Sequence, residues 1–314
     1  MKLTCASSPH IRGNFRTPRI MLDVVIALLP AHVVGAFVLG FESLLIALIS
    51  VAAAVLSEWL YCAVTKSRNT LQDGSAIVTG LLLAMTLPHT VPYWVPAVGS
   101  AFAIIAVKML CGGLGQNIFN PALTARAFLM FIAPASMVRY SALGVDGVTA
   151  ATPLHHMVMP ALPEESVLDM FLGNTPGSIG EISALALLLG GVYLVVRKVI
   201  SPRIPVAYLG TVAVVTLIFS KTGDPVSWML YSLFSGGVML GAIFMATDYS
   251  TSPVTKWGQI LYGIGCGVLT VLFRYFGLYP EGVTYAILIM NAFAWVIDRV
   301  TPPRRFGMKK GGKA

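Results

Sequence analysis

The chain is dominated by apolar runs of about 18 or more residues that recur along almost its whole length. Each run is long enough to cross a hydrocarbon core of roughly 30 Å as an α-helix, at a rise of about 1.5 Å per residue. Only 11% of the 314 residues are charged and 56% are hydrophobic, whereas about a quarter of the residues of a soluble domain are charged. The sequence therefore excludes an ordinary soluble protein and predicts an all-α integral membrane protein.

Hydropathy indicates ten transmembrane segments. They are residues 20–40, 42–64, 75–87, 94–111, 120–133, 181–198, 204–220, 226–247, 257–277 and 283–300.

The distribution of Lys and Arg predicts the orientation of these segments. With the N-terminus inside, 17 of the 21 basic residues fall on inside segments. Only Arg139, Lys221 and Arg274 fall outside, and Arg126 lies within a segment. The positive-inside rule thus predicts that both termini lie in the cytoplasm. The net charge of +8 forms no basic stripe with interleaved aromatic residues, so nucleic acid is not expected as a partner.

Two of the ten segments are too short to cross a bilayer. The apolar runs 75–87 and 121–133 have 13 residues each, or about 20 Å of helix. Asp73-Gly74 precedes the first run, and the glycine-rich residues 112–117 precede the second. Non-helical backbone at membrane depth is tolerated where it lines a cavity or is buried in protein, so these half-helices are expected to border a binding site.

A weak internal repeat divides the chain. Gly80, Thr86 and Pro92 recur as Gly241, Thr247 and Pro253 at a constant offset of 161 residues. Because a unit of five segments is odd, the second unit must be inverted relative to the first. The predicted domains are residues 1–133 (first repeat), 134–180 (extracytoplasmic loop), 181–300 (inverted repeat) and 301–314 (cytoplasmic basic tail). Chance similarity among apolar helices remains the alternative.

Four passages spread over the chain carry a family resemblance. They are residues 73–80 (DGSAIVTG), 112–122 (GGLGQNIFNPA), 146–154 (DGVTAATPL) and 246–253 (ATDYSTSP). In these passages the sequence resembles the family formed by the D subunits of Rnf ion-translocating oxidoreductases and the B subunits of Na⁺-translocating NADH:quinone reductases. The resemblance also implies a fold similar to that of urea transporters.

The resemblance implies that FMN is attached to Thr152 through a phosphoester. Thr149 fills the Ser/Thr position of the family's attachment motif, and Asp146 is suited to orienting a hydroxyl or a metal during the transfer. The residue before a proline is pushed toward extended conformations. Thr152 precedes Pro153, so its hydroxyl is expected to project from the chain. Read without the family, this Thr-Pro is an ordinary turn in an outside loop.

The resemblance further implies a second flavin, riboflavin bound without a covalent bond, near Asn117, Asn120 and Asp248. Asn117 and Asn120 are three residues apart, which puts both amides on one face if this turn is helical. Such amides can match the donor and acceptor edge of a flavin ring. The alternative is that they only satisfy the backbone where the helix is broken.

Arg126 is a candidate phosphate-binding residue, because an arginine within a span usually faces a cavity or the bundle interior. Its alternative role is a salt bridge that ties the half-helix to its repeat mate. No metal site is expected: the four cysteines have no metal-ligand spacing, and the adjacent His155 and His156 point to opposite sides of an extended chain.

The function implied is that of a membrane component of a redox-driven ion pump. The complex would oxidise ferredoxin, reduce NAD⁺ and export Na⁺ or H⁺ across the bacterial inner membrane. The implied partners are the Rnf A and E membrane subunits, the FMN-bearing G subunit, the ferredoxin-side B subunit, the NADH-side C subunit, a flavin transferase and membrane lipid. The chain lacks a nucleotide-binding glycine fingerprint and a cluster motif, so it cannot catalyse the reaction alone.

Two alternatives stay open at this stage. One is the B subunit of a Na⁺-translocating NADH:quinone reductase, which typically has a longer N-terminal extension than the roughly 19 residues that precede the first segment here. The other is a urea-transporter-like channel without a redox role, which would need a continuous polar pore.

Overall fold

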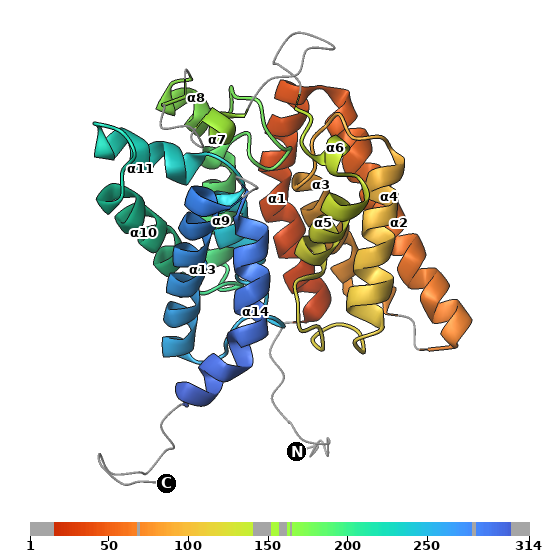
Figure 1. The fold of residues 1–314 in the computed structure, drawn as a ribbon. Coiled ribbons are helices and arrows are strands. Elements are labelled where there is room, and N and C mark those ends of the chain that lie inside the picture. Colours follow the sequence, from red (N-terminus) through yellow and green to blue (C-terminus); the bar gives the residue numbers. More distant parts are fainter. Residues whose placement is uncertain are drawn as a thin grey trace, which may run out of the picture.

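The computed structural model describes residues 16–67, 70–140, 152–156, 162–163, 165–277 and 281–302. Asp146 and Thr149 lie outside the described residues. Within the described ranges all regular secondary structure is helical (Figure 1), which agrees with the predicted fold class.

The first half of the chain forms two long helices followed by three shorter ones. Gly40, with φ 87°, is the one residue between the two long helices. The elements are α1 (Thr17–Leu39), α2 (Phe41–Thr65), the 3₁₀ turn η1 (Leu71–Asp73), α3 (Ser75–Met85), α4 (Trp94–Phe102), its π-helical continuation η2 (Ala103–Met109), α5 (Pro121–Ile132) and α6 (Pro134–Met137).

The second half comes after two short helices and has its two longest helices at its end. Several of its helices begin at side-chain caps; for example, the Ser183 hydroxyl accepts a hydrogen bond from the Ala186 amide at the start of α9. The elements are α7 (Pro153–His156), α8 (Val167–Leu172), α9 (Ala184–Val196), α10 (Arg203–Ile218), α11 (Pro225–Phe234), α12 (Val238–Leu240), the π-helical η3 (Gly241–Met245), α13 (Lys256–Phe276) and α14 (Val283–Val300).

Four helices of the described chain are long and apolar enough to cross a membrane, namely α1, α2, α13 and α14. A fifth span results if α11 and the α12–η3 helix are counted together. The remaining apolar helices have 10 to 17 residues. A helix or helix pair occupies each of the ten predicted ranges. The chain is therefore an all-helical membrane protein in which several helices are shorter than a full span.

The prediction of one continuous segment over residues 226–247 is wrong. The chain bends by 64° between Phe234 and Val238, where Gly236 adopts a φ of 63°. The last carbonyls of α11 are not left unpaired, because the guanidinium of Arg274 in α13 donates to the carbonyl oxygens of Ser232 and Ser235. This is how broken backbone inside a membrane protein keeps its hydrogen bonds.

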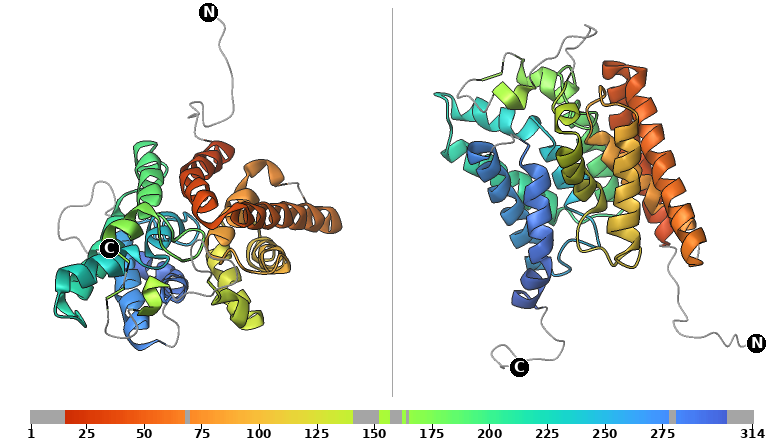
Figure 2. Two further views of the ribbon diagram at one scale, coloured as in Figure 1. Left: turned by 90° about the horizontal axis from the view of Figure 1, so that it is seen from above. Right: turned by 45° about the vertical axis from the view of Figure 1, so that its right-hand side comes forward.

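The two halves lie side by side, and corresponding helices meet across the boundary (Figure 2). Helix α1 packs against α9, and α5 packs against α14. The contact between α1 and α9 is close because Gly190 has no side chain: a Cβ there would lie 2.2 Å from the Ala27 carbonyl oxygen. The internal similarity in sequence thus coincides with matching helices in space.

Helix α3 is buried within the first half through a close approach to α2. A Cβ on Gly80 would lie 2.8 Å from the Cα of Val51, and the Ser50 hydroxyl donates to the Gly80 carbonyl at 2.7 Å. Only glycine permits this spacing.

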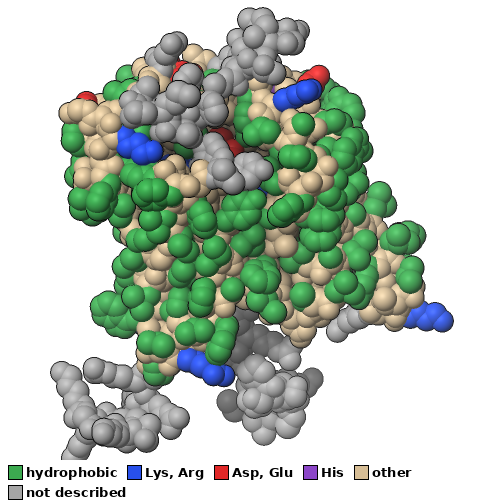
Figure 3. All heavy atoms as spheres, viewed as in Figure 1, with side chains coloured by type: hydrophobic (Ala, Val, Ile, Leu, Met, Phe, Trp, Pro, Cys, Tyr) green, Lys and Arg blue, Asp and Glu red, His purple; other side chains and the backbone are tan. Residues whose placement is uncertain are grey.

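Apolar side chains cover the sides of the molecule, and most of the few charged ones visible in Figure 3 lie near its two ends. The first and last described residues lie at the same end of the bundle, and α7 and α8 lie at the other end (Figure 1). This distribution suits a protein surrounded by lipid.

Candidate functional site

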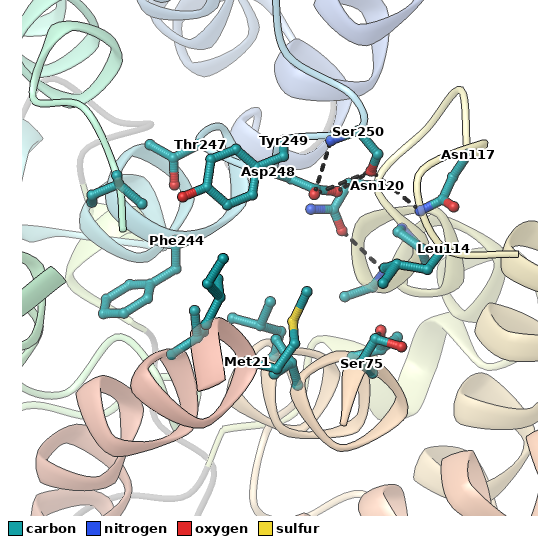
Figure 4. A pocket seen from close by; sticks show the side chains of 18 of the residues that line it. Met21, Ser75, Leu114, Asn117, Asn120, Phe244, Thr247, Asp248, Tyr249 and Ser250 are labelled. Carbon is teal, nitrogen blue, oxygen red and sulfur yellow. Dashed lines mark hydrogen bonds between the residues drawn. The ribbon is translucent and has the colours of Figure 1, made fainter. Parts of the chain in front are cut away.

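A pocket lies between the two halves, toward the end of the bundle where the described chain begins and ends (Figure 4). It holds about 780 Å³ of space not filled by protein atoms, counted out to solvent. Most of its lining is apolar, from α1, α3, α9 and η3, as is usual for small-molecule sites. The polar side chains that line it are Ser75, Thr79, Lys108, Asn117, Asn120, Thr247, Asp248 and Ser250.

Two of the motif passages form loops that shape this pocket. In residues 112–115 three glycines have positive φ values, namely Gly112, Gly113 and Gly115 at 113°, 97° and 86°. They let the chain fold back sharply before α5. In residues 73–75 the Asp73 carboxylate accepts hydrogen bonds from the amide and hydroxyl of Ser75, which starts α3 at the pocket wall.

The structure brings Asn117, Asn120 and Asp248 to one pocket, as the sequence predicts (Figure 4). The first two come from the loop before α5 and the third from the loop after η3, so the pocket draws on both halves of the chain. Residues 117–120 do not form a helical turn, so the condition for placing both amides on one helix face is not met. Asn120 has an extended backbone and caps α5 from outside the helix.

Hydrogen bonds within the fold occupy most of the side-chain amide of Asn120. Its side-chain oxygen accepts from the amides of Ala122 and Leu123, and its nitrogen donates to the Met245 carbonyl at 3.2 Å. These bonds cap α5 and hold it to η3 of the other half. The interpretation that Asn120 satisfies broken backbone therefore agrees with the geometry.

Asn117 is different, because part of its amide is free. Its nitrogen donates weakly to the Ser250 hydroxyl at 3.4 Å, while its buried side-chain oxygen has no partner among the described residues. Leaving a buried acceptor unpaired costs about 1–3 kcal/mol. The side chain is thus placed to accept a hydrogen bond from a ligand in the pocket.

Asp248 faces the same space as a partly buried carboxylate. Burial raises the pKa of Asp248 above its ordinary value, although hydrogen bonds from the amide and hydroxyl of Ser250 act in the opposite direction. Its oxygens are available to accept hydrogen bonds from a ligand in the pocket.

A buried ion pair beside the pocket was not predicted from the sequence. The Lys108 ammonium lies 2.8 Å from each carboxylate oxygen of Glu58 and donates to the Ser75 hydroxyl at 2.6 Å. Lys108 is 1% exposed and Glu58 0%. The sequence alone indicates Lys108 only as an inside charge and Glu58 only as an interfacial residue. The available signal was that both are charged residues at the edges of apolar runs.

Arg126 does not line this pocket. It forms a buried salt bridge with Glu281, which precedes α14, and Glu281 also accepts a hydrogen bond from the Tyr140 hydroxyl at 2.8 Å. The salt-bridge interpretation of Arg126 is therefore confirmed: it ties half-helix α5 to its repeat mate α14. No such partner could be assigned from sequence.

Thr152 lies at the start of α7, at the end of the molecule opposite the pocket (Figure 1). Its side chain is buried at 9% exposure. Leu154 packs toward Gly236 at the bend between α11 and α12. This contact lies next to Thr152 and holds the α7 segment against the bundle. Attachment of a group to Thr152 would require the segment to open.

The pocket, in contrast, suits a planar polar ligand such as a flavin ring. Its walls are mostly apolar, and one unpaired acceptor on Asn117 and one carboxyl group on Asp248 converge on it from opposite halves. A ring with both donors and acceptors along one edge would pair these groups.

The chain resembles known proteins over its whole length. Residues 4–307 match the model of the NQR2, RnfD, RnfE family. The chain is 48% identical to the D subunit of the Na⁺-translocating ferredoxin:NAD⁺ oxidoreductase complex of Acetobacterium woodii, over 99% of this chain and 97% of the relative. It is 44% identical to the D subunit of the proton-translocating ferredoxin:NAD⁺ oxidoreductase complex of Clostridium ljungdahlii, over 98% and 97% of the two chains.

A third relative is the D subunit of the ion-translocating oxidoreductase complex of Stutzerimonas stutzeri, 38% identical over 94% of this chain and 93% of its own. The four motif passages lie within the matched residues 4–307, and three of them shape the pocket or lie beside it. On this agreement of sequence over nearly the full length, the chain belongs to the NQR2, RnfD, RnfE family.

Proposed function

We propose that the chain is the D subunit of an Rnf-type ion-translocating ferredoxin:NAD⁺ oxidoreductase, and that it relays electrons through flavins. The relatives whose names state this activity cover 97% of their own length in the match. In this role the chain works with the other Rnf subunits, namely A, E, G, B and C, and with a flavin transferase. The coupling ion is Na⁺ in the name of one relative and the proton in that of another.

The observation that carries the electron-relay role is the pocket formed by Asn117 and Asp248. The unpaired Asn117 oxygen and the carboxyl group of Asp248 would hold a noncovalent riboflavin by the polar edge of its ring, against apolar walls from α1 and η3. A flavin supplies one- and two-electron transfer. The protein residues orient the ring, exclude water from its faces and provide a proton-exchanging carboxyl group at Asp248.

The second flavin of this proposal is FMN on Thr152, toward the opposite end of the molecule. A carrier at each end would let electrons cross the membrane in two steps. Thr152 is buried at 9% exposure, so the transferase must act on an open form of the segment. Asp146 and Thr149, which belong to the same motif, complete the proposed attachment site.

The proposed topology follows the charge pattern. Ten membrane segments form two inverted repeats, residues 1–133 and 181–300, as in urea transporters. The loop 134–180 faces the outside, and both termini, including the basic tail 301–314, face the cytoplasm. Support comes from the contacts of α1 with α9 and of α5 with α14, which join the two halves.

The experiment measures the two flavins separately in the purified complex. Thr152→Ala should remove the ultraviolet fluorescence of this subunit on denaturing gels. Asn117→Leu combined with Asp248→Leu should lower acid-extractable riboflavin per complex and leave that fluorescence intact. Asn117 is preferred to Asn120 for this test, because Asn120 caps α5 and its loss would damage the fold.

Asn174→Leu is the control, since Asn174 is an exposed amide outside the pocket. Gel fluorescence that survives Thr152→Ala would refute the covalent site. Unchanged extractable riboflavin with sustained electron transfer in the double variant would refute the flavin pocket, and would favour a scaffold or urea-channel-like role for this region.

A further inference from the structure

A second cavity lies between the two halves, at the C-terminal end of half-helix α3, whereas the pocket is lined by residues from Ser75 to Leu82 of that helix. It is smaller, about 290 Å³ of space between atoms. Its lining comes from the C-terminal end of α3, the segment before α9, the start of α12 and the start of α14. The residues are Thr86, Leu123, Arg126, Ser178, Glu181, Gly237, Leu240, Met245, Glu281, Val283 and Thr284.

The internal repeat relates this cavity to the flavin pocket. Thr86 and Thr247 are repeat counterparts, and each donates its hydroxyl at 2.7 Å to a carbonyl of its own half-helix, the first at this cavity and the second at the pocket. The two threonines thus occupy similar positions at the ends of two half-helices, and only the cavity at Thr86 is lined by carboxylates with an unpaired oxygen.

Two oxygen atoms in the cavity lining lack partners among the described residues. Ser178 is 0% exposed, and its hydroxyl makes no hydrogen bond. The Oε1 atom of Glu181 is likewise buried without a partner, while its Oε2 accepts only a long bond of 3.4 Å from the Ser178 amide. Since buried polar groups are normally paired, these two neighbouring oxygens indicate a missing partner.

The charges around the cavity favour a cation as that partner. Glu281 is neutralised by Arg126, whereas Glu181 forms no salt bridge with any described residue. Arg274 lies within electrostatic range of Glu181, but its guanidinium is directed at the last carbonyls of α11, whose helix end is negative.

We propose that this cavity binds a single Na⁺ ion, held by the Glu181 carboxylate and the Ser178 hydroxyl. Hard cations take carboxylate and hydroxyl oxygens as ligands, and residues with both kinds line this space. A Na⁺ ion satisfies both unpaired oxygens at once and offsets the charge of Glu181. The site lies at the interface of the two repeats and does not depend on either flavin.

The test counts Na⁺ ions bound to the whole purified complex, by equilibrium dialysis with ²²Na⁺ at an ionic strength held constant with choline chloride. Glu181→Gln should bind one Na⁺ fewer per complex than the unaltered protein. Ser178→Ala should keep the site but weaken it by about tenfold or more. Glu42→Gln, an exposed carboxylate at the start of α2, is the matched control and should bind as the unaltered protein does.

Assembly is checked by the elution of the complex and by its flavin content, which these substitutions should not change. If Glu181→Gln fails to assemble, Ser178→Ala alone must still weaken one site. Equal Na⁺ stoichiometry and affinity in all variants would overturn the proposal and leave a water molecule in the cavity. Loss of flavin from every preparation would instead refute the proposed function and leave the Na⁺ count interpretable.

Discussion

At Asp248 two opposing effects act on one carboxyl group. Burial raises its pKa, hydrogen bonds from Ser250 lower it, and burial is the larger effect. The ionised form is therefore less stable in the folded protein than in the unfolded chain. Between the unfolded-state pKa of about 3.9 and the higher pKa of the folded state, Asp248 stays protonated in the folded protein and is ionised in the unfolded chain. Over this pH range the folded protein therefore loses stability as pH rises.

Asp248→Asn should remove this penalty, because the amide stays neutral. The melting temperature of the variant minus that of the unaltered complex should therefore grow from pH 4 to pH 7, as measured by scanning fluorimetry in detergent. Asp224→Asn is the contrasting control, because hydrogen bonds from Ser227 lower the pKa of Asp224. The melting temperature of this variant minus that of the unaltered complex should therefore fall over the same pH range. A melting-temperature difference for Asp248→Asn that is constant with pH would contradict the raised pKa of Asp248.

Residue positions in the pocket could be predicted from motifs, but side-chain partners could not. The family passages carry Asn117 and Asp248 and thereby assign them to one site. The pairs Glu58–Lys108 and Arg126–Glu281 join residues far apart in the chain, and a single sequence contains no signal for which acid meets which base. The cap formed by Asn120 could have been read from the Asn-Pro step, since proline is favoured at the first position of a helix.

Among the helices, the contact between α3 and α2 is sensitive to one added carbon. Gly80→Ala would put a Cβ 2.8 Å from the Cα of Val51 and 3.0 Å from the Ser50 carbonyl oxygen. Both are backbone atoms that cannot rotate away. Overpacking of this kind costs about 1–3 kcal/mol, so the variant complex should melt at a lower temperature and yield less assembled protein.

Gly210→Ala is the matched control for this prediction. Gly210 is also within a helix, α10, but a Cβ there meets nothing within 4 Å. Alanine is a better helix former than glycine by about 1 kcal/mol, so this variant should be as stable as the unaltered protein or more so. Equal melting temperatures for the two variants would contradict the close packing of α3.

The ends of the helices could be predicted better than their bends. The short run predicted at residues 75–87 is α3 (Ser75–Met85), because Asp73-Gly74 marks its start. Hydropathy averages over about 19 residues, so that it cannot detect a break of a few residues inside an apolar run. The break between α11 and α12 had one local signal, the consecutive glycines 236 and 237. Its stabilisation by Arg274 had none.

For the molecule as a whole, the proposed orientation can be tested by labelling. In a variant without native cysteines, Gly223→Cys lies before α11, on the side expected outside, and Ser67→Cys follows α2 on the inside. Both positions are exposed. An impermeant maleimide added to intact cells should react with the first cysteine and not with the second. The reverse pattern would overturn the orientation and with it the location proposed for FMN.

Two cavities lie where helices from the two halves of the chain meet. The larger one could be predicted in part, because three motif passages line it or lie beside it. The smaller one could not be predicted, because Ser178 and Glu181 lie in none of the motif passages.

The Glu58–Lys108 pair also constrains how the protein is made. A lone charged side chain in the centre of a bilayer costs about 2.5–3.5 kcal/mol on insertion scales, and these two charges neutralise each other only when α2 and η2 are in contact. Glu58 leaves the ribosome 50 residues before Lys108. Membrane entry of α2 is therefore less favourable with Glu58 unpaired than after the α4–η2 helix has supplied Lys108.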